Sequence, residues 1–178
     1  MFVRDGADST SVRAIADEVG ISAAAVYGYF PDKMALYAAV AEAAFTELGQ
    51  LFAAAQETMD PVERLRAMSK SYVRFGLSNP EAYEIAFAPH IVFRPGPNAT
   101  GENTFAVTAG GQVFAAFHRA VQETPGLNST DAGDDRLARV LWAAGHGIVS
   151  LSRSKADALP LPPEAYVDAL IDALLSRG

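Results

Sequence analysis

The chain has 178 residues, half of them apolar, and a formal net charge of −7. This length fits one domain, or a small domain joined to a larger one, and the apolar content excludes a disordered chain. Because cysteine is absent, disulfides, thiolate metal ligands and cysteine nucleophiles are excluded. No apolar run suits a signal peptide or a membrane span, so we expect a cytoplasmic protein without membrane contact.

Residues 10–33 predict two short helices joined by a tight turn. Apolar residues recur at helical spacing up to Val19, and Gly20 follows where a chain leaves a helix with positive φ. Ser22 can cap the next helix, which we expect to end near Phe30 because proline follows. Together these features form a helix-turn-helix unit. Its expected core is Ile15, Val19, Ile21, Val26 and Phe30.

The rest of the chain predicts further helices separated by clear stop signals. Asp60 and Asn79 each precede a proline, which is typical of a helix start. Residues 89–104 and 125–133 are rich in Pro, Gly and Asn, so we expect loops there. No strand alternation persists, and the predicted fold class is all-α. The expected helices are 32–55, 61–77, 80–87, 105–123, 134–155 and 163–176.

The pattern T-S-V-R-x-I-A-x-x-x-G-I-S-x-x-x-V-Y-x-Y-F-x-x-K resembles the DNA-binding segment of the TetR (tetracycline-repressor) family of bacterial transcription regulators. The resemblance implies a helix-turn-helix DNA-binding domain at 1–40 and an effector-binding and dimerisation domain at 41–178. It implies a repressor that a small apolar or aromatic effector releases from double-stranded operator DNA. Family members carry a full helix before the glycine loop, whereas residues 1–6 resemble only its last turn. We therefore expect the first helix to be largely missing.

The resemblance also assigns DNA contacts. Tyr27 and Tyr29 cannot both point inward, and we expect Tyr27 to enter the groove. Alanine can touch a thymine methyl but makes no hydrogen bond, so the helix offers few polar contacts and the operator sequence cannot be deduced from it. Arg13 alone would also fit a solvated surface residue. The implied contacts are Thr10, Ser11, Arg13, Ser22, Ala23, Ala24, Tyr27, Tyr29 and Lys33.

Basic residues are scarce for a DNA-binding protein. Residues 1–47 hold three, namely Arg4, Arg13 and Lys33, against seven acids. The dependence of DNA affinity on salt counts the phosphates that a protein neutralises. We therefore expect a modest salt dependence.

The last two predicted helices carry apolar residues at near-heptad spacing. Gly145 and Gly147 lie inside the first of them and each costs about 1 kcal/mol relative to alanine, which suits two closely approaching backbones. In the family these helices form a four-helix bundle with a second subunit; an intramolecular helical hairpin is the alternative. The implied homodimer interface is Leu137, Val140, Leu141, Ala144, Ile148, Leu151, Val167, Leu170, Ile171 and Leu174.

Trp142 and His146 share one helix face, in a segment that resembles one group of TetR-like C-terminal domains. With aromatic residues of other helices they could line an effector pocket. The same residues also fit a plain aromatic core, because apolar pockets and cores share one composition. The expected pocket residues are Tyr72, Phe75, Phe114, Phe117, His118, Trp142 and His146.

Catalytic motifs are absent from the sequence. There is no Gly-x-Ser-x-Gly, no phosphate-binding loop and no paired histidine on one turn. His90, His118 and His146 are far apart, so we expect no metal, no cofactor and no enzyme activity. Two alternatives to a regulator are a helical dimerisation module without DNA binding and an all-α enzyme with an unrecognised site.

Overall fold

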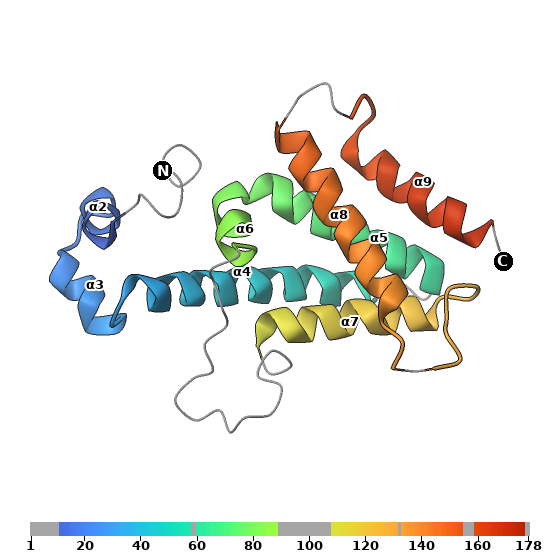
Figure 1. Cartoon of the computed structure of the whole chain (residues 1–178), viewed down its shortest axis with the longest axis horizontal. Coiled ribbons are helices and arrows are strands. Elements are labelled where there is room, and N and C mark those ends of the chain that lie inside the picture. Colours follow the sequence, from blue (N-terminus) through green and yellow to red (C-terminus); the bar gives the residue numbers. More distant parts are fainter. Residues whose placement is uncertain (1–10, 58–59, 89–107, 132, 155–158, 177–178) are drawn as a thin grey trace.

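The computed structural model describes residues 11–57, 60–88, 108–131, 133–154 and 159–176 (Figure 1). These residues form helices and no strand, which confirms the all-α class. None of the helices among them is long and apolar enough to cross a membrane. The helices are α2 (Val12–Glu18), α3 (Ala23–Tyr29), α4 (Lys33–Ala55), α5 (Pro61–Ser78), α6 (Pro80–Ala86), α7 (Ala109–Glu123), α8 (Arg136–Ser154) and α9 (Pro163–Leu175).

Side-chain caps set where the first helices begin. The Ser11 hydroxyl accepts a hydrogen bond from the Ala14 N–H at 3.1 Å, and Ser22 accepts one from Ala25 at 3.1 Å. A cap oxygen of this kind satisfies one of the free N–H groups of the first turn. The expected cap at Ser22 is confirmed. So is the turn glycine, because Gly20 has a φ of 73°.

Later helix starts follow the same chemistry. Asp60 accepts from the Glu63 N–H at 2.9 Å, as its place before Pro61 predicts. Asn79 makes no side-chain cap bond to α6. The expected loop at 89–104 lies outside the described residues, as do 105–107 of the helix expected at 105–123.

The helix-turn-helix unit has a small core of its own. Val12, Ala16 and Val26 are buried, and Phe30 packs against them. The expectation that Val19 and Ile21 belong to this core is wrong, because Val19 is 62% exposed and Ile21 49%. The prediction assumed that the first helix of the motif extends through Val19. Instead α2 ends at Glu18, and Val19 and Ile21 lie at the turn, beyond the part of α2 that α3 covers.

Helix α4 connects this unit to the rest of the chain. Leu36 of α4 packs against the small core, and farther along α4 Phe45, Leu48 and Phe52 are buried in the main core. Figure 1 shows α2 and α3 at one end of α4, with the other helices gathered along the remainder. The expected domain boundary at residue 40 falls within α4, so one continuous helix joins the two parts.

Helix α9 is fixed to α5 by apolar packing and by ion pairs. Arg66 of α5 bonds Asp168 at 2.9 Å and Asp172 at 2.8 Å, and Lys70 bonds Asp168 at 2.7 Å. The hydrogen bonds from Lys70 and Arg66 lower the pKa of Asp168, and the one with Asp172 contributes most to raising the pKa of Arg66. Both carboxylates are partly exposed, so solvent screening limits their contribution to stability.

Three residues of the expected dimer interface belong to the core of a single subunit. Leu141 is 5% exposed, Val167 3% and Ile171 0%. They fill the space among α5, α8 and α9, so they have almost no surface left for a second chain. The expectation is wrong for these three because heptad spacing does not distinguish the face that packs inside the subunit from the face that remains outside.

Helix α8 crosses α5 closely at Gly76. A Cβ at this position would lie 2.8 and 2.9 Å from the Val149 methyl groups and 2.9 Å from the Tyr83 ring. We expect Gly76→Ala to lower the free energy of unfolding by about 1–3 kcal/mol, measured by chemical denaturation, because three helices must separate to admit the methyl group. Gly49→Ala is the matched control, since its nearest neighbour is the Val113 methyl at 3.4 Å. Equal stability of the two variants would contradict this packing.

Candidate functional site

The second helix of the motif turns most of its side chains outward. On α3 only Val26 is buried, whereas Ala24, Tyr27 and Tyr29 are exposed. Tyr27 is 53% exposed and Tyr29 84%. Both tyrosines are therefore accessible to a second molecule. The sequence analysis favoured Tyr27 alone as the tyrosine that enters the groove. Ala23 is half-buried and offers less surface.

The other expected DNA contacts surround this helix. Ser22 and Arg13 are exposed, and Ser11 is exposed as well. Each serine oxygen accepts a cap bond, which leaves its O–H able to donate to a phosphate. Lys33 is half-buried at the start of α4, with its ammonium 5.2 Å from the centre of the Tyr37 ring, a cation–π contact. Thr10 lies outside the described residues.

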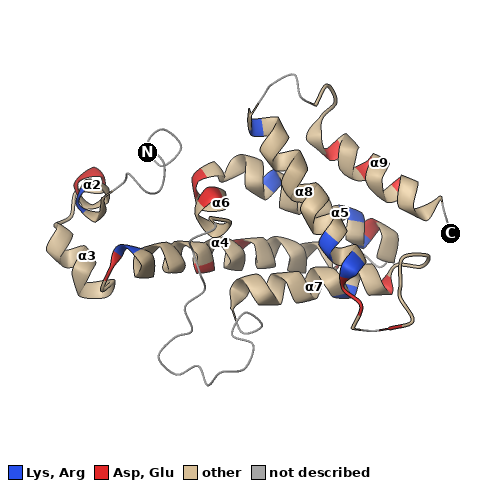
Figure 2. Cartoon of the chain, in the orientation of Figure 1, with Lys and Arg blue, Asp and Glu red and all other residues tan. Residues whose placement is uncertain are grey.

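Charge on this surface is sparse. Figure 2 shows that α3 carries no charged residue, while α2 carries Arg13 together with Asp17 and Glu18. Along α2 and α3, the exposed groups that could face a phosphate are therefore one cation, Arg13, and several hydroxyl groups. Hydroxyl and backbone N–H groups can contact phosphates and position a protein on DNA, as cationic side chains do.

A second group of residues forms an aromatic cluster around Trp142 of α8. The indole centre lies 4.8 Å from the Tyr72 ring, 5.6 Å from Phe117 and 5.7 Å from Phe114. Tyr83 of α6 and Phe87, the residue directly after α6, also belong to the cluster, with ring centres 4.7 Å apart. The sequence analysis did not include these two. Their i, i+4 spacing on a helix opened by a proline was the available signal.

Two expected pocket residues lie elsewhere. His118 lies on α7, and its Nε2 atom is 3.1 Å from the carbonyl oxygen of Asp134, which precedes α8, and 3.3 Å from the Gln122 amide. It follows Phe117 directly, and adjacent residues on a helix point about 100° apart. Phe75 is 2% exposed and packs in the core away from the cavities that border Trp142.

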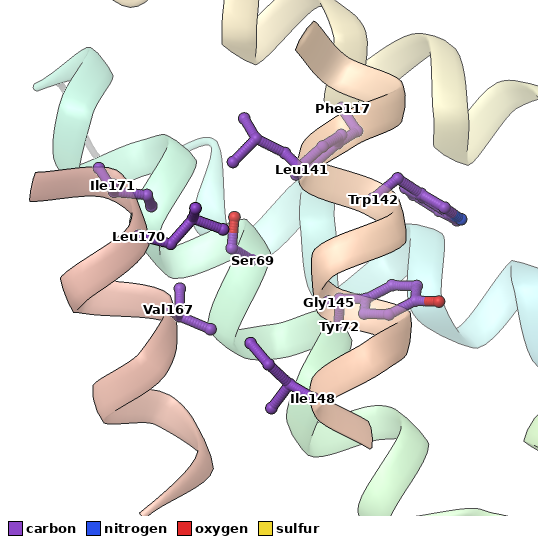
Figure 3. Close-up of a pocket in the computed structure, with 10 residues that line it drawn as sticks. All are labelled: Ser69, Tyr72, Phe117, Leu141, Trp142, Gly145, Ile148, Val167, Leu170 and Ile171. Carbon is purple, nitrogen blue, oxygen red and sulfur yellow. The ribbon is translucent and has the colours of Figure 1, made fainter. Parts of the chain in front are cut away.

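Trp142 separates two cavities of very different size. On one side, among α5, α8 and α9, a cavity of about 20 Å³ is lined by Tyr72, Phe117 and Gly145 (Figure 3). This space suits about one water molecule. On the other side, a cavity of about 320 Å³ is lined by Phe45, Phe87 and Phe114 as well as Trp142. Only the second is large enough for a small organic ligand.

A chain of hydrogen bonds runs beneath the cluster. The Tyr72 and Tyr83 hydroxyl oxygens are 3.1 Å apart, and the Tyr83 oxygen is 2.5 Å from Nδ1 of His146. Burial raises the pKa of Tyr83 to about 12, raises that of Tyr72 further, and lowers the pKa of His146. All three groups are therefore neutral at pH 7. If Tyr72 donates to Tyr83 and Tyr83 donates to Nδ1, every hydroxyl proton in the chain has an acceptor, and the imidazole proton sits on Nε2.

This chain predicts the tautomer of His146. We expect ¹⁵N NMR spectra of the imidazole to show the Nε2–H form at pH 7, with a pKa below the ordinary 6.5. The Tyr83→Phe variant removes the nearest donor to Nδ1 and should weaken the preference for the Nε2–H form. Tyr166→Phe, which alters a hydroxyl on α9, is the control. A doubly protonated ring at pH 7 in the unmodified protein would contradict the assignment.

Comparisons with known proteins agree with this arrangement. The family model of bacterial regulatory proteins of the tetR family matches residues 1–40, and that of the tetracyclin repressor-like C-terminal domain matches residues 65–174. A comparison with curated proteins gives no match. The fold and the exposed motif helix define a helix-turn-helix transcriptional regulator. The chain belongs to the TetR family, and it is a DNA-binding regulator of that family.

Solved structures share the fold along almost the whole chain. A protein of unknown function from a Rhodococcus species is 29% identical with a TM-score of 0.72, covering 98% of this chain and 88% of that chain. The TetR family transcriptional regulator PfmR from Thermus thermophilus is 20% identical with a TM-score of 0.70, covering 98% and 92%. AibR, solved with isovaleryl coenzyme A and operator DNA, is 19% identical with a TM-score of 0.65, covering 98% and 91%.

Proposed function

We propose that this regulator is a homodimeric repressor that binds operator DNA through α3 and is released by a small, largely apolar effector. The exposure of Tyr27 and Tyr29 on a helix capped by Ser22 is the observation that supports this proposal most strongly. These groups project from a unit whose buried core, in the described residues, does not include them. A surface of this kind suits contact with a partner, and in this family the partner is DNA.

One face of α8 supports the dimer. Val140 is 58% exposed and Leu151 47%, and Ala144 and Gly147 are half-buried on the same face. Arg136, one turn before Val140, is a charged residue at the end of this face, and it pairs with Asp134. A Cβ on Gly147 would meet no atom within 4 Å, so packing inside the subunit does not require glycine there. A second backbone approaching this face would require it. Gly145 is different, because a Cβ there would lie 3.1 Å from Tyr72 of the same subunit.

The rest of the proposed interface consists of those residues expected there from the sequence whose side chains keep some solvent-exposed surface. Leu137, Ile148, Leu170 and Leu174 are half-buried and border the exposed face of α8 or lie on α9. Two-fold pairing through this surface would place two α3 helices on one duplex. Half-sites about one helical turn apart would then be read by the two subunits.

Effector control follows from the position of Phe45. This residue of α4 lines the cavity of about 320 Å³ beside Trp142, and its ring packs edge-on against Phe87 at 5.4 Å. A ligand in this cavity would press on the helix that carries α2 and α3. An effector that binds better to the rearranged form than to the DNA-bound form would shift the population away from DNA. A largely apolar ligand fits these walls, with Arg139 as the charged residue at the side.

The DNA-binding roles can be tested by substitution. We expect Tyr27→Ala or Lys33→Ala to weaken binding to the DNA upstream of the gene by about tenfold or more, measured by fluorescence anisotropy, because each dimer loses two contacts. Size-exclusion chromatography with light scattering should show an unchanged dimer. Arg119→Ala, an exposed cation on α7, is the control. If both motif variants bind as tightly as the control, the roles assigned to α3 and the start of α4 are incorrect.

The dimer face can be tested with a charge. We expect Val140→Glu or Leu151→Glu to yield monomers at micromolar concentration, measured by sedimentation, because two like charges would be buried against each other across the two-fold axis. Leu51→Glu is the matched control, since Leu51 is an exposed leucine on α4, 38% exposed, away from this face. A dimer that survives both substitutions would refute this interface.

A further inference from the structure

A second and more polar groove lies between α6 and α8. Its volume is about 630 Å³, within the range of small-molecule sites. His146, Ser150 and Arg153 line it from α8, and their i, i+4, i+7 spacing places them on one helix face. The opposite wall comes from α6 and includes Tyr83 and Glu84.

The polar end of the groove combines hydrogen-bond donors with the Glu84 carboxylate, which is paired with Arg153. The Tyr83 bond occupies Nδ1 of His146, so the imidazole presents its Nε2–H as a donor. Ser150 is exposed and contributes a hydroxyl. The Arg153 side chain is 22% exposed and carries the positive charge. Such a set fits the oxygen atoms of an anionic group.

Among the residues that the structure describes, Glu84 is the carboxylate that pairs with Arg153. One of its nitrogen atoms lies 2.5 Å from Oε1 of Glu84, whose side chain is 43% exposed. A guanidinium has five N–H donors, which exceeds what one such contact uses. A ligand carboxylate could therefore join or replace Glu84, whose long side chain can swing into solvent.

Phe87 connects the groove to the cavity beside Trp142, because it lines both. Its ring centre is 5.1 Å from His146 and 5.4 Å from Phe45 of α4. A molecule with its head group near Arg153 can thus lay an apolar body along Phe87. The exposed face of α8 at Val140 and Leu151 is turned by roughly a third of a turn around the helix from the groove residues, so the proposed dimer contacts a different side of α8.

We propose that the groove between α6 and α8 binds the acidic head group of the effector, and that the effector is a small organic acid with an apolar body. This inference deepens the proposed effector control and rests on it. The head group bonds Arg153 and His146, and the body packs on Phe87. Binding then draws α6 and α8 together at the residue that touches α4.

Isothermal titration calorimetry on the full chain tests the proposal with three acids, hexanoate, benzoate and 3-phenylpropanoate, each paired with its primary amide. We expect at least one acid to bind about tenfold or more tightly than its amide, because only the acid gains the charge-assisted bonds. Arg153→Gln should remove this preference, and Arg119→Gln should keep it. Glu84→Gln should tighten acid binding several-fold, because it removes the competing carboxylate.

Two results would overturn the inference. One is the absence of an acid-over-amide preference in all three pairs, and the other is a preference that survives Arg153→Gln. Glu84→Gln should strengthen acid binding and Arg153→Gln should weaken it. If the Glu84–Arg153 ion pair had only a structural role, both substitutions would break it and would change acid binding in the same direction. Operator binding without ligand is measured in parallel. If the unmodified protein does not bind operator DNA, the repressor proposal is refuted, whereas acid binding can still hold. If it binds operator DNA but none of the acids, only this inference is refuted.

Discussion

The packing of Phe45 between α6 and α7 fixes the position of the helix that carries the DNA-binding unit. Its ring contacts Phe87 edge-on at 5.4 Å, and a Cβ on Gly110 would lie only 3.2 Å from the same ring. α4 therefore meets both neighbouring helices at close range in its middle turns. Because α4 is one continuous helix from Phe45 back to Lys33, and only a short turn separates it from α3, a small rotation at Phe45 becomes a larger displacement at Tyr27. In the proposed dimer, the distance between the two DNA-binding units would therefore depend on this contact.

The features that depend on a few neighbouring residues could be predicted from the sequence. The positive φ of Gly20, the caps at Ser22 and Asp60, and helix ends within a few residues are of this kind. Each follows from local sterics or a local hydrogen bond, which a short stretch of sequence determines. The TetR family also followed from such a stretch, because its motif lies within residues 10–33.

The features that depend on partners from distant helices were predicted less well. Val19 and Ile21 are apolar but exposed, because the end of α2 decides their surroundings. Tyr83 and Phe87 were missed, and His118 was misplaced, because the cluster around Trp142 is assembled from α5, α6, α7 and α8. No spacing within one helix identifies which neighbour will cover it. For the same reason the sequence could not show that Leu141 belongs to the core whereas its neighbour Val140 lies on the outer face of α8.

The two faces of α8 have different proposed functions, dimerisation and effector binding. One face carries Val140, Ala144, Gly147 and Leu151 toward the proposed second subunit, and the other carries Trp142 and His146 toward the ligand cavities. A ligand that shifts α8 would thus act on the dimer and on α4 at the same time. This arrangement gives a physical route from effector to DNA that needs no contact between them, provided that the effector distinguishes two packings of the same helices.

Double electron–electron resonance between spin labels tests the central claim most directly. The chain has no cysteine, so Glu18→Cys places one label on the exposed end of α2 of each subunit. In the dimer, the account predicts one narrow distance distribution, which Phe45→Ala broadens or shifts by several ångströms while light scattering shows an unchanged dimer. An identical distribution with and without the Phe45 ring would contradict the account, because the position of α2 and α3 would then not depend on that contact.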